Sequence, residues 1–332
     1  MPVEISDWDD LDAVRNDLAG DYILINDLDS ETDGYAGIGD DFQPIGFVDD
    51  DTRSEFTGSF DGDGFEIKDL LIEFDQLSTG DIGLFALLAE EGTIKNLIVD
   101  GSVTVTNSDV DDVGGMIGRT ESGDGKIENC GSHIDVTAPD ARRVGVLGGN
   151  TRIQVTRCYT AGSVEADEFV GGLFGLLTNP NPTDNYAVSS VEGRDNVGGC
   201  FGGTNESSHN TSYAAGAVVA DEDAGGYTAS DDDKGEFTDT YWDTEATGQD
   251  TSDGDSEPLT TSEMQGANAE TNLEGFDFAD TWETVLESDE DVSEDGYPIL
   301  SSLDRERQLE AQGIFDGIEP PEPPSNLTAE LL

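Results

Sequence analysis

Carboxylates are the side chains best placed to do chemistry in this sequence, since 75 of its 332 residues are aspartate or glutamate. Asp29, Glu31 and Asp33 occupy alternate positions and are followed by Gly34. Alternating oxygen ligands before a glycine are typical of the opening of a calcium loop. The later glutamate ligand is not at its usual place, so a solvated acidic turn is favoured, with calcium binding by Asp29, Glu31 and Asp33 as the alternative. No cofactor is required; calcium or other cations on acidic loops are the ligands to expect.

Two carboxylates on one face of a protein can also perform acid–base hydrolysis. Asp135 and Glu165 form a candidate pair, since they adjoin Val136 and Val164, which fall at equivalent places in the repeat described below. With so many acidic residues, such a match arises by chance, and a solvated outer face explains both. The two histidines, His133 and His209, have no Ser/His/Asp context. We therefore expect no enzyme, with a carbohydrate-active enzyme as an alternative.

The chain repeats itself, and this repeat must position any functional side chain. Glycines recur at 83, 114, 145, 171, 198 and 225, at intervals of 31, 31, 26, 27 and 27 residues. Valines follow the same period at 103, 136, 164, 191 and 218, and tyrosines at 159, 186, 213 and 241. Three independent series with one period indicate a repeat architecture.

The repeat unit predicts a right-handed parallel β-helix, an all-β solenoid. It contains short β-branched runs separated by Gly, Asn, Asp and Ser, and no helical stripe. A unit of about 27 residues is too short for a propeller blade and fits three short strands and three turns. Like residues would then stack about 4.8 Å apart in successive coils. We expect about eight coils, with a short helix and an irregular C-terminal region covering the ends.

The glycine-rich strands resemble the GLUG repeat, named after its Gly-Leu-any-Gly signature. The signature stands as Gly172-Leu173-Phe174-Gly175, with relaxed copies at 115–118, 145–148 and 199–202. The resemblance covers about residues 20–300. It implies a right-handed β-helix with an adhesive or surface role, and it carries no catalytic residue to transfer to this chain.

The predicted domain organisation has four parts. Residues 1–20 form a capping helix, 21–245 the β-helix, 246–312 a C-terminal cap region, and 313–332 a Pro-rich linker and tail. Phe276, Phe278 and Trp282 are expected to close the far end of the core. Leu327, Leu331 and Leu332 are expected to dock on a neighbouring subunit.

Two smaller groups of residues leave alternatives open. Cys130 and Cys158 are 28 residues apart and therefore occupy equivalent places on neighbouring coils, either as a disulfide or as two small buried side chains. Arg142, Arg143, Arg152 and Arg157 form the one basic cluster, which could bind a neighbour's carboxylates or form internal salt bridges.

The charge of the chain restricts its environment and its partners. Only 14 lysines and arginines oppose the acidic residues, giving a formal net charge of −61. Such self-repulsion is tolerable in molar salt, where the Debye length falls to about 3 Å, so a halophilic source is expected. Nucleic acid is excluded as a partner, because few cations could replace its counterions. No apolar run is long enough for membrane insertion, and no export signal is recognisable at the N-terminus.

The predicted function is that of a non-enzymatic structural or attachment protein. The favoured placement is the surface of a virion of a halophilic archaeon, as a tail fibre, spike or turret component. The alternative is a host cell-surface adhesin or surface-layer accessory. Expected partners are further copies of the chain, with a trimer favoured, other virion or surface proteins, and a host surface glycan or glycoprotein. The loops 107–112 and 120–125 are predicted to supply contact surface.

Overall fold

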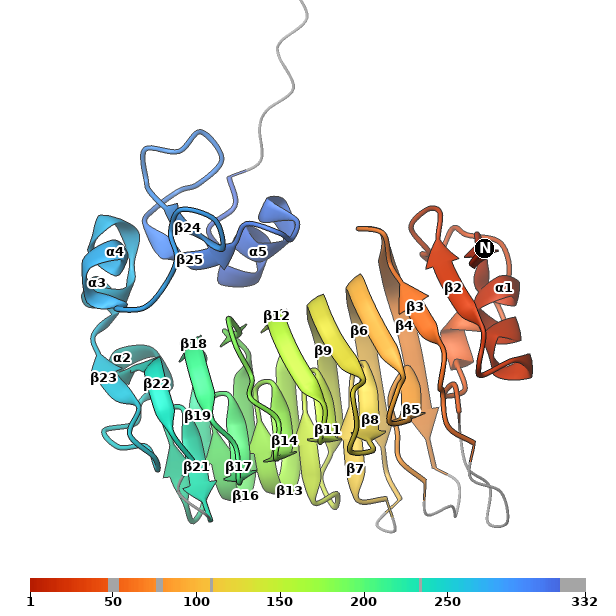
Figure 1. The fold of residues 1–332 in the computed structure, drawn as a ribbon, viewed down its shortest axis with the longest axis horizontal. Helices are drawn as coiled ribbons and strands as arrows, with labels where there is room; N and C mark the ends of the chain where they lie inside the picture. The colour runs from red at the N-terminus through yellow and green to blue at the C-terminus, as the bar shows by residue number, and fades with distance from the viewer. Residues whose placement is uncertain (47–53, 76–79, 108–109, 233–234, 317–332) are drawn as a thin grey trace, which may run out of the picture.

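The chain forms a parallel β-solenoid whose axis runs along the long direction of the molecule (Figure 1). The structure, a computed structural model, describes residues 1–46, 54–75, 80–107, 110–232 and 235–316. A six-stranded sheet contributes one strand to each complete lap, and a seventeen-stranded sheet wraps the remainder of the laps. This confirms the predicted fold class. The described residues make about six complete turns, fewer than the eight predicted, because the laps at both ends are partial.

The strands of the seventeen-stranded sheet are β1 (Val3–Ile5), β2 (Asp21–Leu24), β3 (Ser59–Asp61), β4 (Glu66–Phe74), β6 (Thr93–Val105), β7 (Asp112–Gly114), β9 (Lys126–Ala138), β10 (Arg143–Gly145), β12 (Gln154–Thr160), β13 (Ser163–Gly171), β15 (Tyr186–Ala187), β16 (Ser190–Gly198), β18 (His209–Ala214), β19 (Val218–Ala220), β20 (Ala224–Gly225), β22 (Phe237–Asp243) and β23 (Glu257–Leu259). Those of the six-stranded sheet are β5 (Phe85–Leu88), β8 (Ile117–Thr120), β11 (Gly148–Thr151), β14 (Phe174–Thr178), β17 (Phe201–Asn205) and β21 (Thr228–Asp231).

The three predicted series stack in register along the solenoid. Gly114, Gly145, Gly171, Gly198 and Gly225 pair one above the other in successive parallel strands. The valine and tyrosine series pair in the same way. The glycine column is needed because the chain turns there against its own backbone. A Cβ on Gly198, for example, would overlap the carbonyl oxygen of Phe201.

A further column, which the sequence analysis missed, bends each lap through the left-handed region of φ. Asn96, Asn129, Arg157, Asp184 and Thr211 all have φ between 42° and 57°. Asn and Asp tolerate this conformation better than other residues with a side chain. Side chains of the column also bond to one another, as Asn129 Nδ2 donates to Asn96 Oδ1 at 3.2 Å.

The N-terminal end is covered by α1 (Trp8–Ala13) and the 3-10 helix η1 (Val14–Asn16), as predicted for a capping helix (Figure 1). The Asp7 carboxylate accepts from the Asp10 backbone N–H, which is an N-cap interaction. Trp8, Leu11 and Val14 are fully buried in the core of the solenoid, and the Trp8 indole N–H donates to the Asp29 carbonyl at 2.9 Å. The short strand β1, which was not predicted, adds to β2 and extends the sheet. A second 3-10 helix, η2 (Gly39–Asp41), follows.

The residues from 260 to 316, here called the C-terminal subdomain, fold back along the side of the solenoid (Figure 1). They follow α2 (Thr244–Thr247), which comes directly after β22. The subdomain contains α3 (Thr261–Met264), η3 (Gly266–Asn268), α4 (Ala269–Asn272), the antiparallel pair β24 (Trp282–Val285) and β25 (Gly296–Leu300), and α5 (Arg305–Gln312).

The tyrosine column lies outside the solenoid, beneath this subdomain. Tyr159, Tyr186 and Tyr213 are fully buried, and their rings stack with centroids 5.2 and 5.1 Å apart. With Tyr241 they form one cluster with Phe276, Trp282 and Leu300, here called the outer cluster, which is separate from the core of the solenoid. The expectation that Phe276, Phe278 and Trp282 close the end of the core is therefore wrong; they cover a lateral face, because the repeated tyrosines leave an apolar stripe there. The four predicted domain boundaries remain predictions.

Candidate functional site

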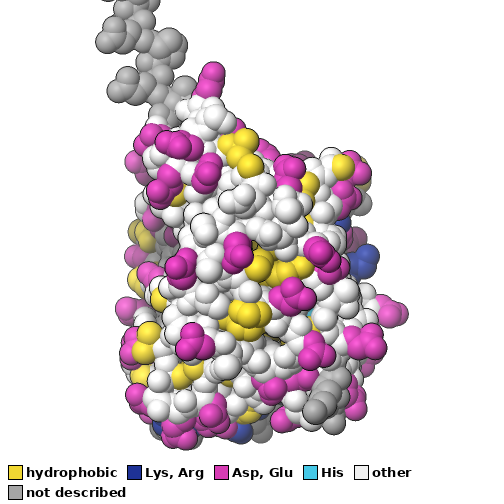
Figure 2. Space-filling view, turned by 90° about the vertical axis from the view of Figure 1, so that its left-hand side faces the viewer, with side chains coloured by type: hydrophobic (Ala, Val, Ile, Leu, Met, Phe, Trp, Pro, Cys, Tyr) yellow, Lys and Arg dark blue, Asp and Glu magenta, His cyan; other side chains and the backbone are white. Residues whose placement is uncertain are grey.

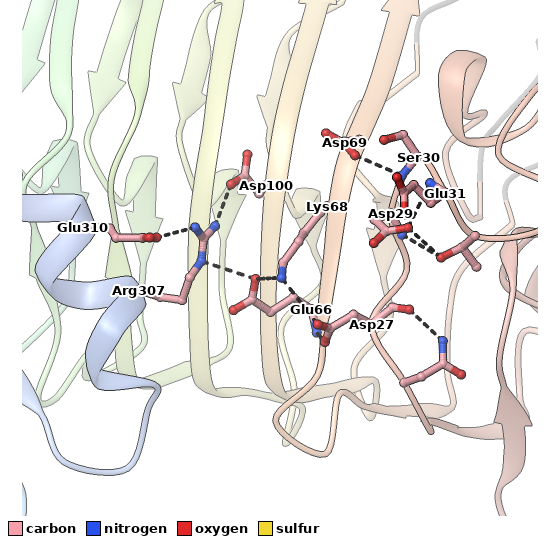
Figure 3. A network of polar contacts seen from close by, with 12 residues as sticks. Asp27, Asp29, Ser30, Glu31, Glu66, Lys68, Asp69, Asp100, Arg307 and Glu310 are labelled. Carbon is pink, nitrogen blue, oxygen red and sulfur yellow. Dashed lines mark hydrogen bonds and ion pairs between the residues drawn. The ribbon is translucent and has the colours of Figure 1, made fainter. Parts of the chain in front are cut away.

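The predicted calcium residues lie in the turn after β2. One oxygen of Asp29 accepts from the Glu31 backbone N–H and from the Thr32 hydroxyl, both at 2.9 Å. Asp69, from β4, reaches the same turn and accepts from the Ser30 N–H at 2.9 Å (Figure 3). Among the residues described, no group of three or more His, Cys, Asp or Glu is arranged to hold a metal ion. Asp29 is thus used in the turn, and calcium binding by Asp29, Glu31 and Asp33 stays a prediction.

The proposed docking residues Leu327, Leu331 and Leu332 lie outside the described residues. Of the two loops predicted to supply contact surface, 107–112 is described only in part, because residues 108 and 109 fall outside the described ranges. The loop 120–125 is described completely and lines a groove, considered below.

Asp135 and Glu165, the candidate carboxylate pair, do not lie opposite each other in neighbouring laps. Val136 pairs with Val164, so Asp135 lies opposite Ser163 and Glu165 lies opposite Thr137. Asp135 accepts a hydrogen bond from the Ser163 hydroxyl at 2.7 Å. Both carboxylates are exposed on the outer face. The prediction that they occupy equivalent positions is wrong, because Glu165 pairs with Thr137, two residues beyond Asp135.

His209 and the three cysteines are buried, and His133 is half-buried. Burial lowers the pKa of both His133 and His209 to about 3, so both rings are neutral near neutral pH. His133 Nε2 lies 2.7 Å from the Tyr159 hydroxyl, at the upper end of the outer cluster. Cys130 and Cys158 stack in register as free thiols, and Cys200 is free as well. Burial raises the pKa of the Cys158 and Cys200 thiols, which makes them poor nucleophiles.

The basic cluster is mostly used within the chain. Arg142 pairs with Glu168 at 3.0 Å, Arg143 with Asp112, and Arg157 with Glu128. Arg152 differs from these three: its guanidinium forms no ion pair in the described part of the chain, and its Nε is buried without a hydrogen-bond partner.

Arg152 lies in a groove of about 520 Å³ on the outside of the solenoid. The walls are loops from consecutive laps: the β8–β9 loop, the short β11–β12 connection and the segment after β14. Its lining residues are Ser122, Gly123, Asp124, Gly125, Lys126, Arg152, Ile153, Gln154, Asn179, Pro180 and Asn181. The groove therefore offers amides, hydroxyls, two cationic side chains and the Asp124 carboxylate, with no aromatic side chain in its lining.

Two features of the fold fix the shape of this loop groove. Gly125 packs so closely on the preceding lap that its N–H donates to the Glu90 carbonyl at 2.6 Å. Lys126 and Gln154 pair in register in adjacent strands, and the Gln154 amide donates to the Asn181 carbonyl in the next lap. The lining side chains thus belong to the repeat itself and form a straight row along the solenoid.

A second polar site joins the C-terminal subdomain to the solenoid (Figure 3). Arg307 of α5 lies 2.6 Å from Asp100 of β6, 2.7 Å from Glu310 and 3.3 Å from Glu66 of β4, the last contact being an ion pair without hydrogen-bond alignment. Glu66 also pairs with Lys68 at 3.2 Å. Burial raises the pKa of Glu66, and the charges of Arg307 and Lys68 oppose that rise. These ion pairs, here called the clamp, link α5 of the C-terminal subdomain to strands β4 and β6 of the solenoid.

Comparisons with known proteins give one similarity in sequence. Halomucin from Haloquadratum walsbyi is 30% identical to this chain over 185 residues, which is 54% of this chain and 2% of halomucin. The chain thus spans a very small part of the length of that relative. No protein-family model matches, so the GLUG resemblance stays a prediction. A Bacteroides ovatus crystal structure, named as that of a candidate immunoglobulin A1 protease, is 17% identical, covers 91% of this chain and 93% of its own, and has a TM-score of 0.49.

Proposed function

We propose that this chain is a non-enzymatic structural and attachment module on the outer surface of a halophilic archaeon or of a virion that infects it. The observation that carries the proposal is a stiff parallel solenoid of about six turns whose sequence is similar, over 54% of its length, to halomucin. In a parallel solenoid every lap is hydrogen-bonded to the laps on both sides, which suits a rod that presents loops at a fixed spacing. None of the helices in the described part of the chain is long and apolar enough to cross a membrane.

The acidic surface supports a halophilic setting. Figure 2 shows acidic side chains spread over the visible face, with few lysines and arginines among them. With a net charge of −61, mutual repulsion would destabilise the folded chain at low ionic strength. Molar salt screens this repulsion, so we expect the folded protein to require salt.

The absence of an enzymatic role is part of the proposal. It is supported by the burial of His209 and of the three cysteines, and by the mismatched register of Asp135 and Glu165. Incubation with surface glycans, followed by measurement of new reducing ends, tests this point. Turnover that a single carboxylate substitution abolishes would overturn it.

The finer placement on a virion, as a tail fibre, spike or turret, is part of this proposal, as is assembly into a trimer. Labelling of intact cells with an antibody against the chain tests the surface placement, and blotting of purified virus particles separates a virion from a cellular surface. Label on intact cells or particles is the expected result. Detection only after lysis, with empty particles, would contradict a surface role. Sedimentation of the protein in molar salt measures the oligomeric state.

A further inference from the structure

The loop groove holds the two cations of the described chain that no carboxylate neutralises. Every other lysine and arginine that the structure describes forms an ion pair with aspartate or glutamate. Lys126 and Arg152 do not, although acidic residues outnumber basic ones 75 to 14 in the chain. Both unpaired cations line the same groove.

The two carboxylates that most closely precede Lys126 in the sequence form no ion pair with Lys126 or Arg152. Glu121 binds Arg119 at 2.9 Å, and Asp124 lines the groove without forming an ion pair with Lys126 or Arg152. The Nε of Arg152 is buried without a partner, and an unsatisfied buried donor on a charged group carries a desolvation cost. An anion bound in the groove would recover that cost.

The repeat shows that this part of the column is specialised. Lys126 pairs with Thr93 in the lap before it and with Gln154 in the lap after it. Two other basic residues of the sheet have an acidic neighbour at the equivalent position: Lys95 has Asp61 and Glu128, and Arg143 has Asp112. The residues stacked on Lys126 are polar but uncharged, and Lys126 is exposed, so its charge faces solvent in the groove, which Asp124 also lines.

We propose that the loop groove binds the carboxylate or sulfate group of an anionic glycan. Arg152 and Lys126 would pair with the acidic group, and Gln154, Asn179 and Ser122 would bond to neighbouring hydroxyls. In molar salt only direct contact survives screening, and charge-assisted hydrogen bonds are of this kind. The row from Lys126 to Asn181 crosses two strand spacings, about 10 Å, which matches an extended ligand lying along the axis.

Other polyanions fit the groove less well. Nucleic acid binding depends on many cations and on aromatic side chains that stack with bases, whereas this groove has two cations and no aromatic lining. An extended acidic peptide binds best to an open strand edge, but the lining of this groove belongs to strands and loops already paired within the repeat. A sparsely charged glycan avoids repulsion by the acidic surface.

The test is calorimetric titration of the whole chain in molar KCl with three probes: a galacturonate oligomer, a sulfated galactan oligomer and an uncharged galactan oligomer. We expect one or both charged probes to bind and the uncharged probe not to bind. Replacing Lys126 and Arg152 together (K126Q and R152Q) should weaken binding at least tenfold, with unchanged thermal unfolding. Arg194→Gln is the matched control, since it removes an exposed cation that pairs with Asp167 outside the groove, and it should bind like the parent chain.

Three results would overturn the proposal. These are the absence of binding by either charged probe, an equal loss of binding in Arg194→Gln, and displacement of the glycan by an acidic peptide of equal affinity, which would assign the groove to protein. The choice of a glycan as the ligand rests on the proposed surface role. The titration nevertheless tests glycan binding separately from the surface placement. A chain found on intact cells without glycan binding refutes the groove alone, and binding by a chain absent from surfaces refutes the placement alone.

Discussion

The core of the solenoid and the outer cluster lie on opposite sides of the same strands but are built differently. Inside, each residue packs on its equivalent in the next lap, as Val144 does on Val170 and Val170 on Val197. Outside, the repeated tyrosines meet a partner that does not repeat: the Tyr186 hydroxyl donates to Gln308, 122 residues away, at 3.0 Å. Repetition therefore builds the solenoid, whereas the non-repeating C-terminal subdomain covers the tyrosine column and removes it from solvent.

The largest effect should come from removing the aromatic ring at the junction of these regions. Tyr186 is fully buried between Tyr159 and Tyr213 and beside Trp282, so Tyr186→Ala leaves a cavity and should destabilise the protein by about 4 kcal/mol. We expect the C-terminal subdomain to become sensitive to protease while the solenoid stays resistant. Tyr186→Phe, which loses only the bond to Gln308, should cost about 1 kcal/mol. If the subdomain of Tyr186→Ala resists protease as well as that of the parent chain, the tyrosine column does not hold the subdomain on the solenoid.

The glycine column tests the interior side of the comparison. In Gly198→Ala the new methyl group would overlap the carbonyl oxygen of Phe201, and backbone atoms on both sides cannot withdraw. We expect a loss of about 3 kcal/mol in urea unfolding, with the solenoid itself affected. Gly64→Ala is the control, because its φ is +85° but nothing lies within 4 Å of the added carbon. It should cost about 1 kcal/mol. Similar losses in both variants would mean that backbone conformation, not the stacking of laps, accounts for the repeated spacing of the glycines.

The clamp between the two regions gives a smaller effect. Arg307→Met removes one of the two cations that face Glu66, which is 7% exposed, and leaves only Lys68 beside this buried carboxylate. It should destabilise the protein by about 2.5 kcal/mol. In a Glu66→Gln background the same substitution should cost clearly less. Arg194→Met, at an exposed cation on another face, should have no measurable effect. Additive losses from Arg307→Met and Glu66→Gln would show that the two charges do not interact.

The repeat made much of the fold predictable, since residues that stack on their own kind leave a period in the sequence. The structure places a helical turn at Thr261–Met264, where Thr260 and Glu263 form a capping box, and this local pattern is visible in the sequence. The sequence did not predict that Trp282 packs on Tyr186, since a contact between a repeat and a non-repeating segment has no period. In the groove, Arg152 was identified as a cation available to a partner, but Lys126 was missed. The signal was its uncharged neighbours in adjacent laps, Thr93 and Gln154, which become visible only once the register is known.

The smallest expected effect is on the pH dependence of the unfolding free energy, and it comes from a histidine in the core of the solenoid. His209 lies in the core, its ring 4.4 Å from that of Phe237, and burial lowers its pKa to about 3. The unfolded chain takes up a proton near pH 6.5 while the folded chain does not, so this residue reduces stability as pH falls from 6.5 toward 3. His209→Phe should therefore lessen the loss of unfolding free energy between pH 7 and pH 5 by about 2 kcal/mol, measured by urea unfolding in molar salt. Tyr227→Phe is the control: it removes the hydroxyl 3.3 Å from His209 Nδ1 and leaves the titrating ring, so its pH profile should parallel that of the parent chain. A parallel profile for His209→Phe as well would mean that this ring is already protonated, or accessible to solvent, in the folded protein.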